Sequence, residues 1–132
     1  MTKPELKRDD LIYPELSYKL IGTAFKVFND TGYGMNEKFY QKIFAKELES
    51  ENLNFDKEKL IKINYQGEEV GRYFLDFIVD NKIVVELKVR PRFGYVHVKQ
   101  VMDYLKTTGY KLAILIYFTR DGVKYRRVIN AL

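Results

Sequence analysis

Residues 73–89, YFLDFIVDNKIVVELKV, are the part of this sequence that says most about its fold. Two runs rich in aromatic, Val and Ile residues flank the turn-forming pair Asp80-Asn81, a pattern typical of two antiparallel strands joined by a hairpin. The second run is apolar on both faces, as in a central strand that is covered on both sides. Three charged residues interrupt these runs: Asp76 in the first, and Glu86 and Lys88 in the second.

The segments around this hairpin predict the rest of the fold. Toward the N-terminus, apolar residues recur at helical spacing from about Leu11 to Asn29, and again from the N-cap Asn36 to about Ser50. The remaining predicted elements are strands over 58–65, 69–79 and 82–89, a helix over 95–107 closed by Gly109, and a last hairpin of 111–118 and 123–129 around Asp121-Gly122. The order ααβββαββ predicts an α/β (α+β) sandwich, with helices flanking a mixed central sheet.

The composition limits the kinds of site that this chain can build. Its 132 residues are 46% hydrophobic and include 20 Tyr and Phe, which favours a single folded domain over residues 11–132 after a polar arm at residues 1–10. The absence of cysteine excludes disulfides and thiolate zinc sites, and the single histidine, His97, excludes a multi-histidine metal site. Any metal ion must therefore be bound by oxygen atoms.

The hydropathy and charge patterns indicate the partners of the chain. The longest apolar run, Leu112 to Phe118, is far shorter than the roughly 18 residues of a membrane helix, so we expect a cytoplasmic protein with no membrane partner. From Lys82 to Leu132 there are 11 basic and 3 acidic residues, which favours a polyanionic partner such as nucleic acid. A solvated lysine-rich surface is the alternative. The sequence is compatible with a homo-oligomer but has no feature that decides the oligomeric state.

The charges inside the two core strands require a compensating partner, because burial of an isolated charge is costly. One account is an internal ion pair of Lys88 with Glu86 or Asp76. The other is that the two carboxylates bind a hard divalent cation while Lys88 lies beside the reacting group. The second account requires Asp76 to lie opposite Glu86, which needs a three-residue loop, Asp80 to Lys82, or a bulge.

Three motifs in this order give the sequence a family resemblance. Asp76 followed by Glu86-Leu87-Lys88 on the next strand resembles the PD-(D/E)XK nuclease superfamily, although Leu75 stands where the family name has Pro. Residues 34–40, GMNEKFY, match the signature of its GxxExxY family. Gln100 and Tyr104 match the QxxxY motif of its exonuclease-like branch. The resemblance covers roughly residues 12–130 and implies a restriction-endonuclease-like fold.

The resemblance also implies a metal-dependent nuclease that hydrolyses phosphodiester bonds, with DNA expected in preference to RNA. The implied ligands of Mg²⁺ or Mn²⁺ are Asp76, Glu86, the carbonyl of Leu87 and, as an additional ligand or water-holder, Glu37. Lys88 would position the attacking water, and Gln100 and Tyr104 would contact the substrate phosphate or orient Lys88. The implied catalytic residues are thus Glu37, Asp76, Glu86, Lys88, Gln100 and Tyr104. Each motif outside the two strands also has a simpler explanation: Glu37 suits a helix N-terminus, and the QxxxY pair suits packing.

The segment Arg90 to Tyr95, which follows the third strand, combines two arginines with two aromatic residues. Such residues bind phosphates and stack on unpaired bases, although a solvated turn would have a similar composition. The predicted nucleic-acid-binding residues are Arg90, Arg92, Phe93 and Lys99. His97 is assigned no role beyond packing or surface exposure. A non-cleaving nucleic-acid-binding module with the same fold is the alternative to a nuclease, and a purely structural domain with a buried ion pair is the third possibility.

Overall fold

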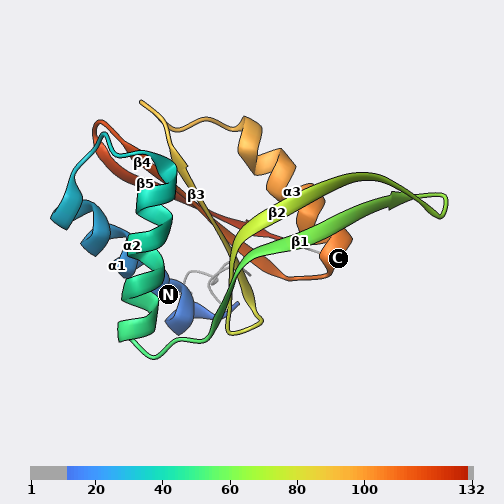
Figure 1. Ribbon diagram of the computed structural model, residues 1–132, viewed down its shortest axis with the longest axis horizontal. Helices are drawn as coiled ribbons and strands as arrows, with labels where there is room; N and C mark the ends of the chain where they lie inside the picture. Colours follow the sequence, from blue (N-terminus) through green and yellow to red (C-terminus); the bar gives the residue numbers. More distant parts are fainter. Residues whose placement is uncertain (1–11, 131–132) are drawn as a thin grey trace, which may run out of the picture.

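The computed structural model describes residues 12–130, whose helices and strands follow the predicted order ααβββαββ (Figure 1). The elements are α1 (Pro14–Thr31), α2 (Glu37–Ser50), β1 (Phe55–Tyr65), β2 (Glu68–Val79), β3 (Ile83–Val89), α3 (Val96–Thr108), β4 (Leu112–Thr119) and β5 (Gly122–Ile129). The predicted arm at residues 1–10 and the predicted helix start at Leu11 lie outside the described residues. The first helix begins at Pro14. Proline suits this position because it lacks an N–H group, and N–H groups in the first turn have no partner within the helix.

The five strands form one mixed sheet in the order β1-β2-β3-β4-β5. Neighbouring strands are antiparallel except β3 and β4, which are parallel and are connected by α3. Helices α1 and α2 pack on one face of the sheet and α3 packs on the other, an arrangement that can be followed in Figure 1. The predicted sandwich of helices around a mixed central sheet is therefore confirmed.

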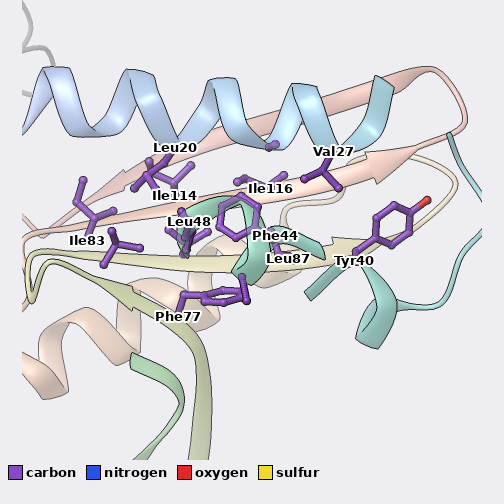
Figure 2. Packing of buried hydrophobic residues seen from close by; sticks show 14 of the residues in the cluster. Leu20, Val27, Tyr40, Phe44, Leu48, Phe77, Ile83, Leu87, Ile114 and Ile116 are labelled. Atoms are coloured by element: carbon purple, nitrogen blue, oxygen red, sulfur yellow. The ribbon is translucent and has the colours of Figure 1, made fainter. Parts of the chain in front are cut away.

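The middle strands are buried on both faces because helices cover both sides of the sheet. All side chains of β4 and the first five of β3 are buried. On the face covered by α1 and α2, Leu20, Val27 and Phe44 pack with Phe77 and Ile114 of the sheet (Figure 2). This packing holds β2 and β3 in a fixed position, and these two strands carry the charged residues that the sequence singled out.

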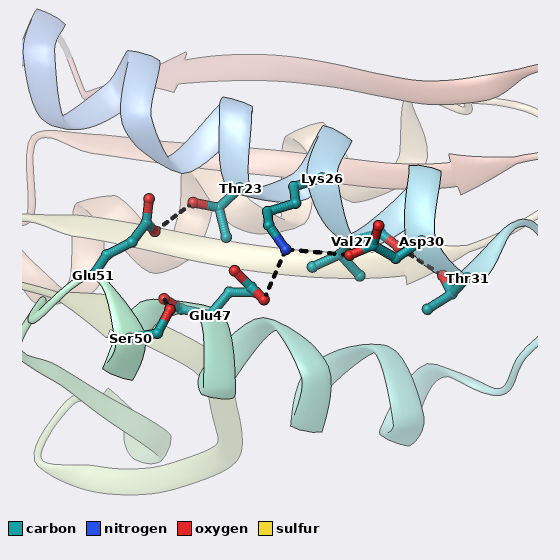
Figure 3. A network of polar contacts seen from close by, with 8 residues as sticks. All are labelled: Thr23, Lys26, Val27, Asp30, Thr31, Glu47, Ser50 and Glu51. Carbon is teal, nitrogen blue, oxygen red and sulfur yellow. Dashed lines mark hydrogen bonds and ion pairs between the residues drawn. The ribbon is translucent and has the colours of Figure 1, made fainter.

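Polar contacts tie α1 to α2 along their exposed side (Figure 3). The Lys26 ammonium lies 3.2 Å from the carboxylate of Asp30 and 3.1 Å from that of Glu47. Thr23, which is buried, donates a 2.8 Å hydrogen bond to Glu51. Exposed ion pairs contribute about 1 kcal/mol at most, so these contacts set the register of the two helices more than they stabilise the fold.

The loop between β2 and β3 has three residues, Asp80–Lys82, as the metal-binding account required. Asp80 and Asn81 have φ values of 53° and 52°. Asp and Asn tolerate this left-handed conformation better than most other residues with a side chain. The two-residue turn predicted at Asp80-Asn81 is therefore wrong, because the loop also includes Lys82.

The last hairpin also turns one residue earlier than predicted. Its turn residues are Arg120 and Asp121, and Gly122 already pairs with Thr119 as the first residue of β5. Thr119 accepts a hydrogen bond from the N–H of Asp121 and donates one to the carbonyl of Gly122. These side-chain hydrogen bonds hold the turn in place, which turn propensities alone do not predict.

Removal of the N-cap of α2 is expected to destabilise the protein modestly. The Asn36 side chain accepts a 3.3 Å hydrogen bond from the N–H of Phe39, which also donates a 3.1 Å hydrogen bond to the backbone carbonyl of Asn36. Asn36→Ala should lower the free energy of unfolding by about 1 kcal/mol, measured by urea denaturation. Asn29→Ala, an exposed position inside α1, is the matched control and should change stability by less than about 0.5 kcal/mol. Equal effects of the two variants would contradict the capping role.

Candidate active site

The register of β2 and β3 brings Asp76 and Glu86 together. The two strands pair through Phe77 with Val85, Ile78 with Val84 and Val79 with Ile83, so the next positions along them are Asp76 and Glu86. A carboxylate oxygen of Glu86 accepts a 2.6 Å hydrogen bond from the N–H of Asp76. A carboxylate oxygen of Asp76 accepts a 2.8 Å hydrogen bond from the N–H of Leu87. Each carboxylate therefore binds the backbone of the opposite strand.

The side chains of β2 switch to the opposite face of the sheet at Asp76. Tyr73 and Leu75 pack with the cluster on the α3 face of the sheet, whereas Phe77 packs with the cluster on the α1 and α2 face. Opposite Asp76, the ladder with β1 omits Glu58, which has a φ of 54°, although the register is the same on both sides of this gap. At Asp76, pairing with β1 is thus interrupted for one residue, and the paired residues of β2 and β3 end one position before it.

Burial dominates the electrostatics of the two carboxylates. The Glu86 side chain is 0% exposed, and burial, with the nearby charge of Asp76, raises its pKa above the usual value for glutamate. Burial also raises the pKa of Asp76, an effect opposed by the hydrogen bond from Leu87 and by the charge of Lys88. When both are ionised, the buried Glu86 and the half-buried Asp76 repel each other, so a nearby cation is favourable.

Lys88 lies close to both carboxylates without a direct ion pair. Its positive charge lowers the pKa of both Asp76 and Glu86, and its side chain is half-buried. Among the ion pairs of residues 12–130, none within 4.0 Å involves Lys88. The geometry therefore differs from the internal ion pair considered from the sequence, because neither carboxylate contacts Lys88 directly.

These oxygen donors fit a hard divalent cation in chemical type. Mg²⁺ and Mn²⁺ prefer carboxylate and carbonyl oxygens, and Asp76 and Glu86 supply two carboxylates from adjacent strands. The described residues contain no cluster of three or more acidic or histidine side chains arranged to hold a metal. The expected third acid, Glu37, is thus not grouped with the other two.

Glu37 lies at the end of β3 instead. Its carboxylate accepts a 3.2 Å hydrogen bond from the N–H of Val89 and lies 3.5 Å from the guanidinium of Arg90. It is near enough to raise the pKa of Asp76 through its negative charge. The N-terminus of α2 thus places Glu37 beside the residues that follow Lys88.

Two side chains that the sequence analysis did not single out also contact the carboxylates. Tyr73 donates a hydrogen bond to Glu86, and Gln41 makes a side-chain hydrogen bond to Asp76 that lowers its pKa. Gln41 follows Glu37 by one helical turn, so helical spacing could have indicated that both face the same strand. Tyr73 had no such signal, because the change of face at Asp76 is not encoded in the alternation of residues.

Gln100 and Tyr104 of α3 are connected to Glu86 through Tyr73. The ring of Tyr104 stacks on that of Tyr73, with centroids 3.7 Å apart and an interplanar angle of 23°. Gln100 makes a side-chain hydrogen bond to Tyr104. The QxxxY pair is therefore linked through Tyr73 to Glu86, and Tyr104 is buried rather than open to a phosphate.

The predicted nucleic-acid-binding residues occupy two surfaces. Arg90, Arg92 and Phe93 lie on the loop after β3, and Lys99 lies on the exposed side of α3. Phe93 is half-buried and the other three are exposed. His97, which was assigned only a packing role, is half-buried and hydrogen-bonds through Nδ1 to the Tyr117 hydroxyl, which donates to the carbonyl of Gly94.

No helix of residues 12–130 is long and apolar enough to cross a membrane.

A comparison with curated proteins gives no match. Among solved structures, the crystal structure of SSO0001 resembles this chain with a TM-score of 0.56 and 24% sequence identity over 72% of this chain. The match spans 50% of the SSO0001 chain, and at this identity it supports the fold alone.

A family model described as the PD-(D/E)XK nuclease superfamily matches residues 14–128. The match includes all the helices and most of the sheet, and it contains both strands that bring Asp76 and Glu86 together. The mixed sheet between helices is consistent with the restriction-endonuclease-like fold of that superfamily. The chain therefore belongs to the PD-(D/E)XK nuclease superfamily.

Proposed function

We propose that this protein is a nuclease that hydrolyses phosphodiester bonds in the presence of Mg²⁺ or Mn²⁺, with DNA as its preferred substrate. The observation that carries the proposal is the reciprocal bracing of Asp76 and Glu86, each bonded to the backbone of the opposite strand, with Lys88 beside them. A fold that needed only stability would gain more from apolar residues at these positions, because a buried charged group is costly to desolvate.

Within the superfamily, we assign the chain to the GxxExxY family on residues 34–40. The Tyr40 side chain is fully buried, donates a hydrogen bond to the carbonyl of Gly32 and stacks on Phe118 with ring centroids 4.5 Å apart. Glu37, in contrast, reaches the end of β3. The motif thus combines a tyrosine that anchors the start of α2 with a glutamate that this anchoring directs toward the candidate site.

In this proposal, Asp76, Glu86 and the carbonyl of Leu87 hold the cation. A bound divalent cation supplies neutralisation of phosphate charge and lowers the pKa of water. Glu37 binds Arg90 at the end of β3. Gln41 and Tyr73 orient the two carboxylates. Gln100 and Tyr104 act at a distance, since their contact with Glu86 runs through Tyr73.

Lys88 is the residue that we assign to the reacting groups. Its ammonium donates hydrogen bonds, which can orient the attacking water and stabilise the negative charge that develops on the phosphate. Arg90, Arg92 and Lys99 carry the complementary charge for the nucleic-acid backbone, and Phe93 offers a ring for a base. Their charges fit the basic character of the second part of the chain.

The proposal is tested by incubating the protein with single-stranded DNA, double-stranded DNA and RNA, each with Mg²⁺, Mn²⁺ or EDTA. We expect cleavage that requires the metal and is lost in Asp76→Asn, purified in parallel. Cleavage that persists in Asp76→Asn would identify a contaminating nuclease and contradict the proposal. Salt-dependent binding without cleavage under every condition would favour the alternative, a nucleic-acid-binding module that retains the fold.

A further inference from the structure

A cavity of about 400 Å³ lies between the loop after β3 and the β4-β5 hairpin. This volume is within the range of sites for small organic ligands. The residues that line the cavity include Arg92, Phe93, Tyr95, Lys124, Tyr125 and Arg126. Three of them come from β5, which the sequence analysis did not connect with the loop.

The aromatic residues of the cavity present ring surface to solvent. Tyr95 is 67% exposed and Tyr125 is 47% exposed. Phe93 is held between two rings, with its centroid 5.2 Å from Tyr95 and 4.7 Å from Tyr117. Tyr125 packs edge-on against Phe25 of α1, at 6.4 Å between centroids, and pairs with Ile116, so its ring lies on the α1 and α2 face of the sheet. Tyr95 lies on the α3 face beside Arg126, and its exposed ring surface suits the stacking of a flat aromatic ligand.

The charges of the cavity favour an anionic ligand. Arg92, Lys124 and Arg126 line it, and Asp121 is the only acid among the described lining residues. None of these three cations takes part in an ion pair among residues 12–130. The guanidinium of Arg126 lies 5.5 Å from the centroid of the Tyr95 ring, a contact that leaves its charge available. An anion bound here would thus meet uncompensated positive charge.

The cavity is also connected to the candidate active site. Phe93 packs on Tyr117, and Tyr117 is the pairing partner of Lys88 across β3 and β4. Because Tyr117 is buried, this contact links the two sites through the interior of the protein. A base that stacks on Tyr95 gives up its neighbours in a duplex, so the cavity suits an unpaired base.

We propose that this cavity binds one unpaired nucleotide of a single-stranded substrate, with Tyr95 stacking on the base and Arg92, Lys124 and Arg126 binding the adjoining phosphates. This inference rests on the proposed nuclease function, and it specifies the form of nucleic acid that the protein selects.

The test measures binding of a fluorescent oligodeoxythymidine of about 12 nucleotides, and of a DNA duplex of equal length, in EDTA so that cleavage does not intervene. We expect the Tyr95→Ala variant to bind the single strand about tenfold more weakly and the duplex almost unchanged. The Tyr95→Phe variant should keep the wild-type affinity, because stacking needs the ring and not the hydroxyl. Tyr65→Ala is the matched control, since Tyr65 is 65% exposed at the end of the β1-β2 hairpin, far from the β4-β5 hairpin in Figure 1.

Three results would overturn the inference. Unchanged single-strand binding in the alanine variant, in a protein that still cleaves DNA, would remove the subsite and leave the nuclease proposal intact. Equal loss of single-strand and duplex binding would show that Tyr95 does not recognise an unpaired base. If the wild-type protein neither binds nor cleaves nucleic acid, the nuclease proposal and the subsite fail together.

Discussion

Replacement of Lys88 by methionine is expected to slow metal-dependent cleavage of nucleic acid by a factor on the order of 10³. Methionine keeps most of the apolar length of the side chain but lacks the ammonium that lies beside both carboxylates. The loss should appear in the rate of the chemical step, measured in single-turnover experiments with saturating enzyme. The variant should keep the thermal stabilisation that Mn²⁺ gives the wild-type protein, because Lys88 carries no oxygen ligand.

The controls separate this role from general effects of charge. Lys46→Met removes an exposed lysine from α2 and should leave the cleavage rate unchanged. Asp76→Asn should lose both cleavage and stabilisation by Mn²⁺, since it removes a proposed ligand. If Lys88→Met cleaves at more than about a tenth of the wild-type rate, Lys88 does not act on the reacting groups.

The metal-free protein is expected to lose stability as the pH rises from about 4 to about 8. Burial raises the pKa of Asp76 to about 6 and that of Glu86 to about 8, whereas carboxyl groups of an unfolded chain titrate near pH 4. Between these values the folded protein binds more protons than the unfolded chain. The stabilisation from these two protonated carboxyl groups is therefore fully present below about pH 4 and is lost as the pH rises through their raised pKa values. We expect the free energy of unfolding to fall by several kcal/mol over this range, measured by urea denaturation in EDTA.

Glu86→Gln isolates this effect from the other titrating groups. The amide oxygen can accept the hydrogen bond from the N–H of Asp76, and the amide NH₂ can donate to the Tyr73 hydroxyl, which donates to Glu86 in the wild-type protein. The variant should be more stable than the wild-type protein at pH 8 and should show a flatter dependence on pH. Saturating Mn²⁺ should remove much of the difference at pH 8, because a bound cation favours the ionised carboxylates. An identical pH dependence in both proteins would contradict the raised pKa of Glu86.

Most of the fold could be predicted because local patterns carry it. The helical spacing of Leu20, Ala24 and Val27 predicts α1, and the cap Asn36 marks the start of α2. The errors were small shifts at element ends, as at Pro14 and at the last hairpin turn. Such positions depend on single hydrogen bonds and on turn geometry, whereas the pattern of apolar residues specifies only the body of an element.

Less of the site could be predicted. The residue types and the spacing of Glu86 and Lys88 indicated a site, and the required three-residue loop is present. Glu37 was expected beside the other acids, but it binds the end of β3. Tyr73 was missed because β2 changes the face that it presents at Asp76. The regular alternation of a strand cannot indicate where that alternation is interrupted.

Local sequence was thus sufficient for the type and order of the helices and strands, for the apolar core strand and for the presence of unpaired charge within it. Only the folded chain decided which groups meet: Asp76 with the backbone of Leu87, Glu86 with Tyr73, and the loop after β3 with β5. The reason is physical. Hydrophobic periodicity is a property of neighbours along the chain, whereas hydrogen bonds and electrostatic interactions in a site depend on distances between segments that are remote in sequence.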